Sequence, residues 1–145
     1  MLAALISLQL AASEPATMAA EPPLPSLTLD AYRVKDGDTF RDTGRGYDIQ
    51  LHGVDAPEIE HAKYPAERER GEAAASRVRE LLAAAEAVSY AKAYIPRDAR
   101  KWPVDGFRRR LATVSIDGRD LGVTLLAEGH AKVHFGDDHH WDWCS

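Results

Sequence analysis

The chain has 145 residues, and its 18 lysines and arginines against 23 aspartates and glutamates give a formal net charge of −5. This length is enough for one domain with a modest core. The acidic balance excludes a generally basic nucleic-acid coat protein, but not a local basic site, because the field depends on where charges lie. The one cysteine, Cys144, excludes an intrachain disulfide, and we expect a free thiol.

The N-terminal residues 1–20 are apolar and rich in small side chains. Residues 2–12 are long enough for the apolar region of a signal peptide and too short to span a bilayer. They lack the basic residues that usually precede such a region, so a disordered leader is the alternative. We expect residues 1–20 to be a signal peptide or leader, the protein to be exported to the periplasm or secreted, and no membrane span.

The segment 21–26, EPPLPS, is a proline-rich linker that predicts an extended, non-helical chain. We place the folded domain at 27–134. In chain order, β-type residues predict strands at 27–34, 39–42, 47–51, 88–95 and 108–116. Helical spacing predicts helices at 66–85 and 121–128, with Gly129 ending the second and an extended segment at 130–134. The order of these elements predicts a mainly β fold with α (α+β), a five-stranded OB-type barrel with two helices.

Acidic residues flank the second and third predicted strands. Asp36 and Asp38 precede 39–42, and Asp55 and Glu58 follow 47–51. The linker Thr43-Gly44-Arg45-Gly46 is typical of a hairpin, which would bring the two acidic groups together. Carboxylates gathered in one place repel each other, and hard cations such as Ca²⁺ take such oxygen ligands. Each motif alone also fits a plain turn or a strand end.

The tail 135–145, FGDDHHWDWCS, combines histidines, aspartates, two tryptophans and Cys144. Such a cluster is compatible with a transition metal, but its spacing matches no zinc pattern. We expect a polar tail whose tryptophans pack back on the barrel.

Three motifs occur in order: DGDT at 36–39, GVDAPE at 53–58 and FRRRLA at 107–112. Together they resemble the thermonuclease (staphylococcal nuclease-like) family, over roughly residues 27–133. The resemblance implies an OB-fold, Ca²⁺-dependent phosphodiesterase that acts on single-stranded or denatured DNA and RNA, cleaves the 5′-O–P bond and leaves 3′-phosphates. We expect a monomer. The long C-terminal helix of the family is reduced or absent in this sequence.

The resemblance also implies roles for individual residues. Asp38, Asp55 and the backbone carbonyl of Ala56 correspond to the metal ligands, and Asp36 would orient ligands or waters around them. Glu58 corresponds to the residue that holds the attacking water, as a general base. Arg109 corresponds to an arginine whose planar guanidinium grips phosphate oxygens.

One position departs from the family pattern: Gln50 replaces the usual second arginine. Its amide donates hydrogen bonds but carries no charge, and loss of a transition-state donor costs about 3–4 kcal/mol, a factor of about 10²–10³ in rate. Arg41, Arg45 and Arg108 are candidates to compensate by binding phosphate. Gly106 and Phe107 also stand where the family often has lysine and tyrosine, which reduces polar contact with a neighbouring phosphate.

Two alternatives to the nuclease remain open. A catalytically weakened OB-fold module would bind single-stranded nucleic acid without cutting it, and Gln50 is the main support for this reading. A structural or interaction domain that binds no nucleic acid would suit the acidic total charge. The set formed by Asp38, Asp55, Glu58 and Arg109 speaks against a pure binding module.

Overall fold

The computed structural model describes residues 26–93, 101–134 and 141–144. The predicted leader and nearly all of the proline-rich linker lie outside the described residues, as do part of the loop before Lys101 and the histidines of the tail.

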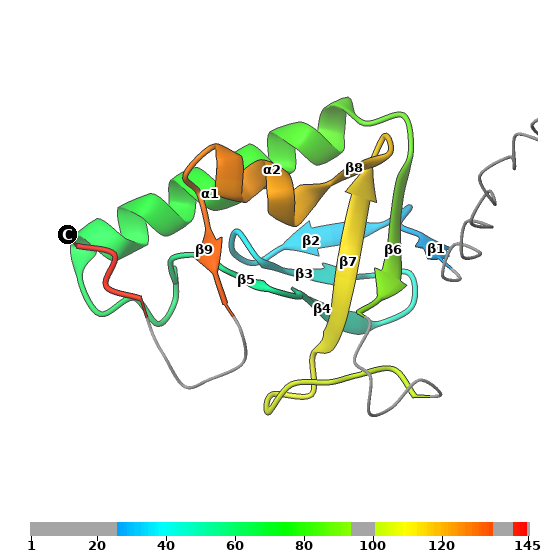
Figure 1. Cartoon of the computed structure of the whole chain (residues 1–145), viewed down its shortest axis with the longest axis horizontal. Helices are drawn as coiled ribbons and strands as arrows, with labels where there is room; N and C mark the ends of the chain where they lie inside the picture. Colours follow the sequence, from blue (N-terminus) through cyan, green and yellow to red (C-terminus); the bar gives the residue numbers. More distant parts are fainter. Residues whose placement is uncertain (1–25, 94–100, 135–140, 145) are drawn as a thin grey trace, which may run out of the picture.

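A curled β-sheet forms the body of the protein, and Figure 1 shows the bend of this sheet. Its strands follow the order β1-β6-β7-β4-β3-β2, with β8 paired to β7. All neighbours are antiparallel except β4 and β7, which are parallel. The bounds are β1 Ser26–Thr28, β2 Tyr32–Val34, β3 Thr39–Asp42, β4 Tyr47–Leu51, β6 Val88–Lys92, β7 Arg110–Ile116 and β8 Arg119–Asp120.

The two ends of this path, β1 and β2, are neighbours in the chain. The sheet therefore curls towards itself as a half-barrel, which confirms the predicted OB-type α+β fold. The predicted first strand is divided into β1 and β2, because β1 pairs with β6 and β2 pairs with β3. Leu29 donates its backbone N–H to the carbonyl of Val88, the first residue of β6, whereas the carbonyl of Ala31 accepts from Thr43, just after β3.

The bounds of two predicted strands differ from those in the structure. The strand predicted at 108–116 begins at Arg110, because Arg108 has a φ of 64° and cannot continue a ladder. The strand predicted at 88–95 ends at Lys92, and residues 94–95 lie outside the described part of the chain. The strand predicted at 47–51 has these bounds in the structure, and a further short strand, β5 (Val54–Asp55), follows it and pairs with β9 (Lys132–Val133). This pair joins the acidic GVDAPE segment to the extended segment after the second helix.

Helix α1 (Pro65–Ala84) crosses the sheet, as Figure 1 shows, and α2 (Leu121–Ala127) lies beside β7 and β8. Both lie within a residue of their predicted bounds. Ala74, Val78 and Leu82 of α1 are buried, so the predicted apolar face is the one that packs. They join a core of buried strand residues that includes Phe40, Ile49, Tyr90 and Val114.

The last described residues fold back on the barrel, as predicted. Trp143 is buried, and the ammonium group of Lys132 in β9 lies 5.1 Å from the ring centre of Trp141 and 4.7 Å from that of Trp143. No helix follows α2 in the part of the chain that the structure describes. Among the same residues, no helix is long and apolar enough to cross a membrane.

Candidate functional site

The hairpin of β3 and β4 brings the two acidic segments into contact. Asp38 lies immediately before β3, and its carbonyl accepts the backbone N–H of Leu51 at 2.8 Å. Its carboxylate reaches the second segment directly, since Oδ2 accepts the backbone N–H of Ala56 at 2.9 Å. The backbone N–H of Asp38 in turn donates to the carboxylate of Asp36 at 3.3 Å. Asp36, Asp38 and the residues around Ala56 thus form one site.

Two glycines allow this close approach. A Cβ at Gly37 would lie 2.8 Å from the Cβ of Ala74 and 2.9 Å from that of Ala56. A Cβ at Gly71, inside α1, would lie 2.7 Å from the carbonyl oxygen of Pro57 and 2.8 Å from that of Glu58. Real Cβ atoms do not come so close to other atoms. Helix α1 therefore packs directly on the backbone of Pro57 and Glu58 and supports the site.

Asp38 is an unfavourable place for a negative charge. It is only 5% exposed, and burial raises the pKa of its carboxyl well above the usual range. The charges of Asp36 and Asp55 raise this pKa further, while the N–H of Ala56 lowers it. The three carboxylates are thus close enough to repel one another.

Glu58 is half-buried and lies within the electrostatic field of the same aspartates. Burial and the charge of Asp36 raise the pKa of its carboxyl, Arg109 lowers it, Asp55 raises it and His61 lowers it. The net shift is upwards, in the direction that suits a general base working near neutral pH. The guanidinium of Arg109 is therefore close enough to stabilise a negative charge on Glu58.

Arg109 is held from two sides. Its Nε donates to Asp105 Oδ2 at 2.6 Å, an ion pair in which both side chains are mostly buried. Its NH1 donates to the hydroxyl of Thr39 at 3.0 Å. That hydroxyl lies 2.7 Å from Gln50 Oε1 and 3.1 Å from Asp38 Oδ1, and its single proton can serve one of these oxygens at a time. Thr39 thus links Arg109, Gln50 and Asp38.

The three other candidate arginines occupy different places. Arg41 donates to Asp48 on the neighbouring strand at 3.0 Å. Arg45 bonds Asp42 at 2.9 Å and the carbonyl of Thr28 at 2.7 Å, at the turn end of the hairpin. Arg108 is exposed next to Arg109. In this structure, Arg41 and Arg45 neutralise aspartates outside the carboxylate group.

The donor chemistry of the site fits a hard cation. In the described part of the chain, no group of three or more His, Cys, Asp or Glu side chains is arranged to hold a metal. However, the mutual repulsion of Asp36, Asp38 and Asp55 is the situation that a cation relieves, and carboxylate and carbonyl oxygens are the ligands that Ca²⁺ takes. Asp38 Oδ2 accepts the backbone N–H of Ala56, and both oxygens of this carboxylate keep lone pairs for a cation.

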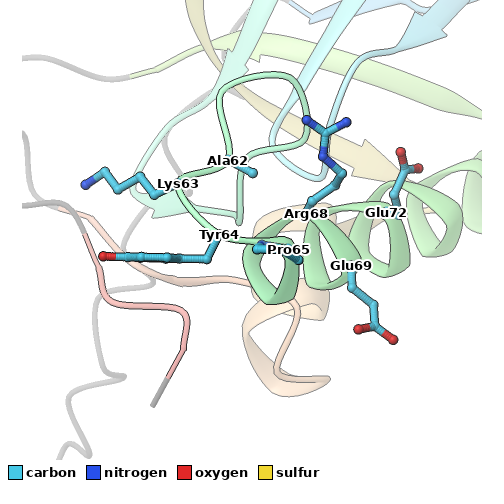
Figure 2. Close-up of a pocket in the computed structure, with 7 residues that line it drawn as sticks. All are labelled: Ala62, Lys63, Tyr64, Pro65, Arg68, Glu69 and Glu72. Carbon is cyan, nitrogen blue, oxygen red and sulfur yellow. The ribbon is translucent and has the colours of Figure 1, made fainter.

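A separate pocket lies beside the start of α1, and Figure 2 shows its lining. Lys63 and Tyr64 extend from the loop before the helix, while Arg68, Glu69 and Glu72 project from its first turns. This pocket contains none of the predicted site residues, and its lining charges are of both signs. We assign no role to it.

Sequence reasoning missed three residues that build the site. Asp105 holds Arg109, and its position four residues earlier in a turn was an available signal. Gly71 interrupts a helical pattern at a cost of about 1 kcal/mol relative to alanine, which usually has a packing reason. Thr39 belongs to the DGDT motif, but its contacts with Gln50 and Arg109 could not be predicted, because these partners come from distant parts of the chain.

The geometry can be compared with known proteins. The sequence model of the staphylococcal nuclease homologue family matches residues 48–142. The chain belongs to this family. A search of curated proteins finds no match.

The family match includes Gln50, Asp55, Glu58 and Arg109 and begins after the Asp36–Asp38 turn. In the structure, the Asp36–Asp38 turn contacts the matched segment, because Asp38 accepts a hydrogen bond from the backbone N–H of Ala56. Membership indicates a nuclease-like or nucleic-acid-binding OB-fold module.

Proposed function

We propose that this protein is a Ca²⁺-dependent nuclease that hydrolyses phosphodiester bonds in single-stranded or denatured DNA and RNA. The observation that carries the proposal is the set of contacts that joins the two acidic segments to Arg109: Asp38 accepts from Ala56, and the hydroxyl of Thr39 lies between Asp38 and Arg109. A substrate phosphate needs a cation and hydrogen-bond donors on one side and a base for water on the other. A pure binding module needs no such set of Asp38, Asp55, Glu58 and Arg109.

Each residue has a distinct task in this proposal. Glu58 accepts a proton from the attacking water, and the water oxygen forms a bond to phosphorus as the 5′-O–P bond breaks. The leaving 5′-oxygen takes a proton from solvent, so the products are a 3′-phosphate and a 5′-hydroxyl. Arg109 donates to phosphate oxygens as their charge grows. Asp38, Asp55 and the carbonyl of Ala56 hold Ca²⁺, and Asp36 orients the ligands. When bound, Ca²⁺ offsets the phosphate charge and polarises the P–O bonds.

A second candidate is an OB-fold module that binds single strands without turnover. Gln50 favours it, because its amide accepts from Thr39 and brings no positive charge to the phosphate. Arg41 and Arg45 are engaged by Asp48 and Asp42, so replacement of the missing arginine by either requires it to leave an ion pair.

The test is digestion of denatured DNA by protein that begins after Ala20, with Ca²⁺, with EGTA, and with Glu58→Gln. We expect cutting that needs both Ca²⁺ and Glu58. Product ends that carry only 5′-phosphates would refute the assigned bond. Binding of Ca²⁺ and DNA without cutting would favour the second candidate, and Gln50→Arg should then raise the rate.

Export through residues 1–20 and a monomeric state complete the proposal. Export would place the protein where Ca²⁺ is plentiful. Processing is checked by mass spectrometry of the protein recovered from the growth medium or periplasm, and the oligomeric state by light scattering.

A further inference from the structure

An aromatic side chain stands exposed next to the arginine of the site. Phe107 is 82% exposed, although large apolar side chains usually lose such exposure on folding. The guanidinium carbon of Arg109 lies 5.2 Å from the centre of its ring. One side of the ring therefore meets the guanidinium, and most of its surface remains open.

The turn that presents Phe107 is fixed by hydrogen bonds. Asp105 Oδ1 accepts the backbone N–H groups of both Phe107 and Arg109 at 2.9 Å. The N–H of Arg108 donates to the carbonyl of Asp105 at 3.0 Å, and Arg108 adopts a positive φ of 64°. A non-glycine residue in this conformation is held there by its surroundings. The exposure of Phe107 thus comes from a defined turn.

The same carboxylate holds the backbone of Phe107 and the side chain of Arg109, because Asp105 Oδ2 also accepts from Arg109 Nε. The ring and the guanidinium form a pair with an open aromatic surface and a cation beside it. Successive groups in a single-stranded nucleic acid, a flat base and a phosphate, have the matching chemistry. In a duplex the base faces are stacked on each other and unavailable.

We propose that Phe107 is a stacking platform for a nucleobase next to the phosphate bound by Arg109, and that it sets a preference for single strands. This inference rests on the proposed function. Phe107 lacks the hydroxyl group of the tyrosine often found at this position in the family, so it has no polar contact to offer a phosphate. Every base has an aromatic face, so the preference would not depend on base identity.

The test separates base contacts from phosphate contacts. Glu58→Gln protein, which we expect to bind without cutting, is titrated in Ca²⁺ against a fluorescent oligothymidylate of about 12 nucleotides. A second probe is an abasic strand of the same length, which has the phosphates and lacks the bases. Fluorescence anisotropy gives both dissociation constants.

We expect Phe107→Ala to weaken oligothymidylate binding by about five- to a hundredfold and to leave abasic binding unchanged. Phe107→Trp should keep the affinity and show fluorescence quenching beyond that of the parent protein. Arg108→Ala should weaken both probes equally. The matched control is Val104→Ser, another exposed apolar position on the same turn, which should change neither constant.

If Phe107→Ala loses affinity equally for both probes, the inference is overturned. If Phe107→Ala loses no affinity for either probe, the inference is also overturned, and a protein partner for this ring would be indicated. Wild-type protein that binds and does not cut would refute the nuclease and leave the stacking result valid. Absence of binding to either probe would overturn the stacking inference, whereas the nuclease proposal is judged by digestion of denatured DNA with the wild-type protein.

Discussion

At the scale of single residues, the site depends on side chains that hold the reacting groups in place. Asp105 accepts three hydrogen bonds, from the backbone N–H groups of Phe107 and Arg109 and from Arg109 Nε. Thr39 bonds the other end of Arg109. A guanidinium restrained at both ends is already oriented for phosphate, which lowers the entropic cost of the transition state.

We therefore predict that Asp105→Ala lowers kcat on denatured DNA by about a hundredfold, because Arg109 loses its orientation. The matched control is Glu80→Ala, which removes an exposed carboxylate paired with Arg77 within α1 and should leave kcat unchanged. Thermal denaturation establishes that both variants are folded. A wild-type kcat in Asp105→Ala would show that Arg109 needs no such restraint.

At the scale of elements, α1 and the hairpin meet the GVDAPE segment without side chains between them. Gly37 and Gly71 provide these contacts, one from the turn before β3 and one from the helix. The pair β5–β9 holds the segment from its other side, where Asp55 is opposite Lys132. Glu58 is thus positioned by elements that are far apart in the sequence.

We predict that Gly71→Ala destabilises the protein by about 1–3 kcal/mol, because the added Cβ collides with backbone oxygens that cannot move freely. It should also reduce kcat, since one of these oxygens belongs to Glu58. Ser76→Ala at an exposed position of α1 is the control, and its better helix propensity should stabilise by a few tenths of a kcal/mol. Urea denaturation measures both. Stabilisation by Gly71→Ala would refute the packing argument.

At the scale of the whole molecule, a net negative protein concentrates several carboxylates at one partly buried site. Asp38 has a raised pKa through burial and through its acidic neighbours Asp36 and Asp55. A carboxyl whose pKa is raised by folding destabilises the folded state above its unfolded pKa, about 3.9, and this penalty disappears as the pH falls below that value.

We predict that, without Ca²⁺ at pH 7, Asp38→Asn has a higher free energy of unfolding than the wild type. The difference should vanish as the pH falls below about 4, where the wild-type side chain is protonated in both states. Added Ca²⁺ should stabilise the wild type and not the variant, because it binds only the folded carboxylate site. Chemical denaturation across pH, with and without Ca²⁺, measures both effects. If Ca²⁺ raised the free energy of unfolding of both proteins equally, Asp38 would not be a Ca²⁺ ligand.

The sequence by itself determined the order of the elements and the residues of the two acidic segments. Both are local properties: alternation, helical spacing and turn residues act within a few positions, and the hairpin linker brings Asp38 and Ala56 together. The apolar face of α1 around Val78 was predictable for the same reason.

Only the tertiary structure decided how the site is held. Asp105 and Thr39 reach Arg109 across the fold, and Gly71 contacts Glu58 because a helix packs on a loop. The pairing of Arg41 with Asp48 and of Arg45 with Asp42 likewise depends on side-chain direction on twisted strands. Such contacts join residues through space, and a single sequence carries no signal for distances between elements that are remote in the chain.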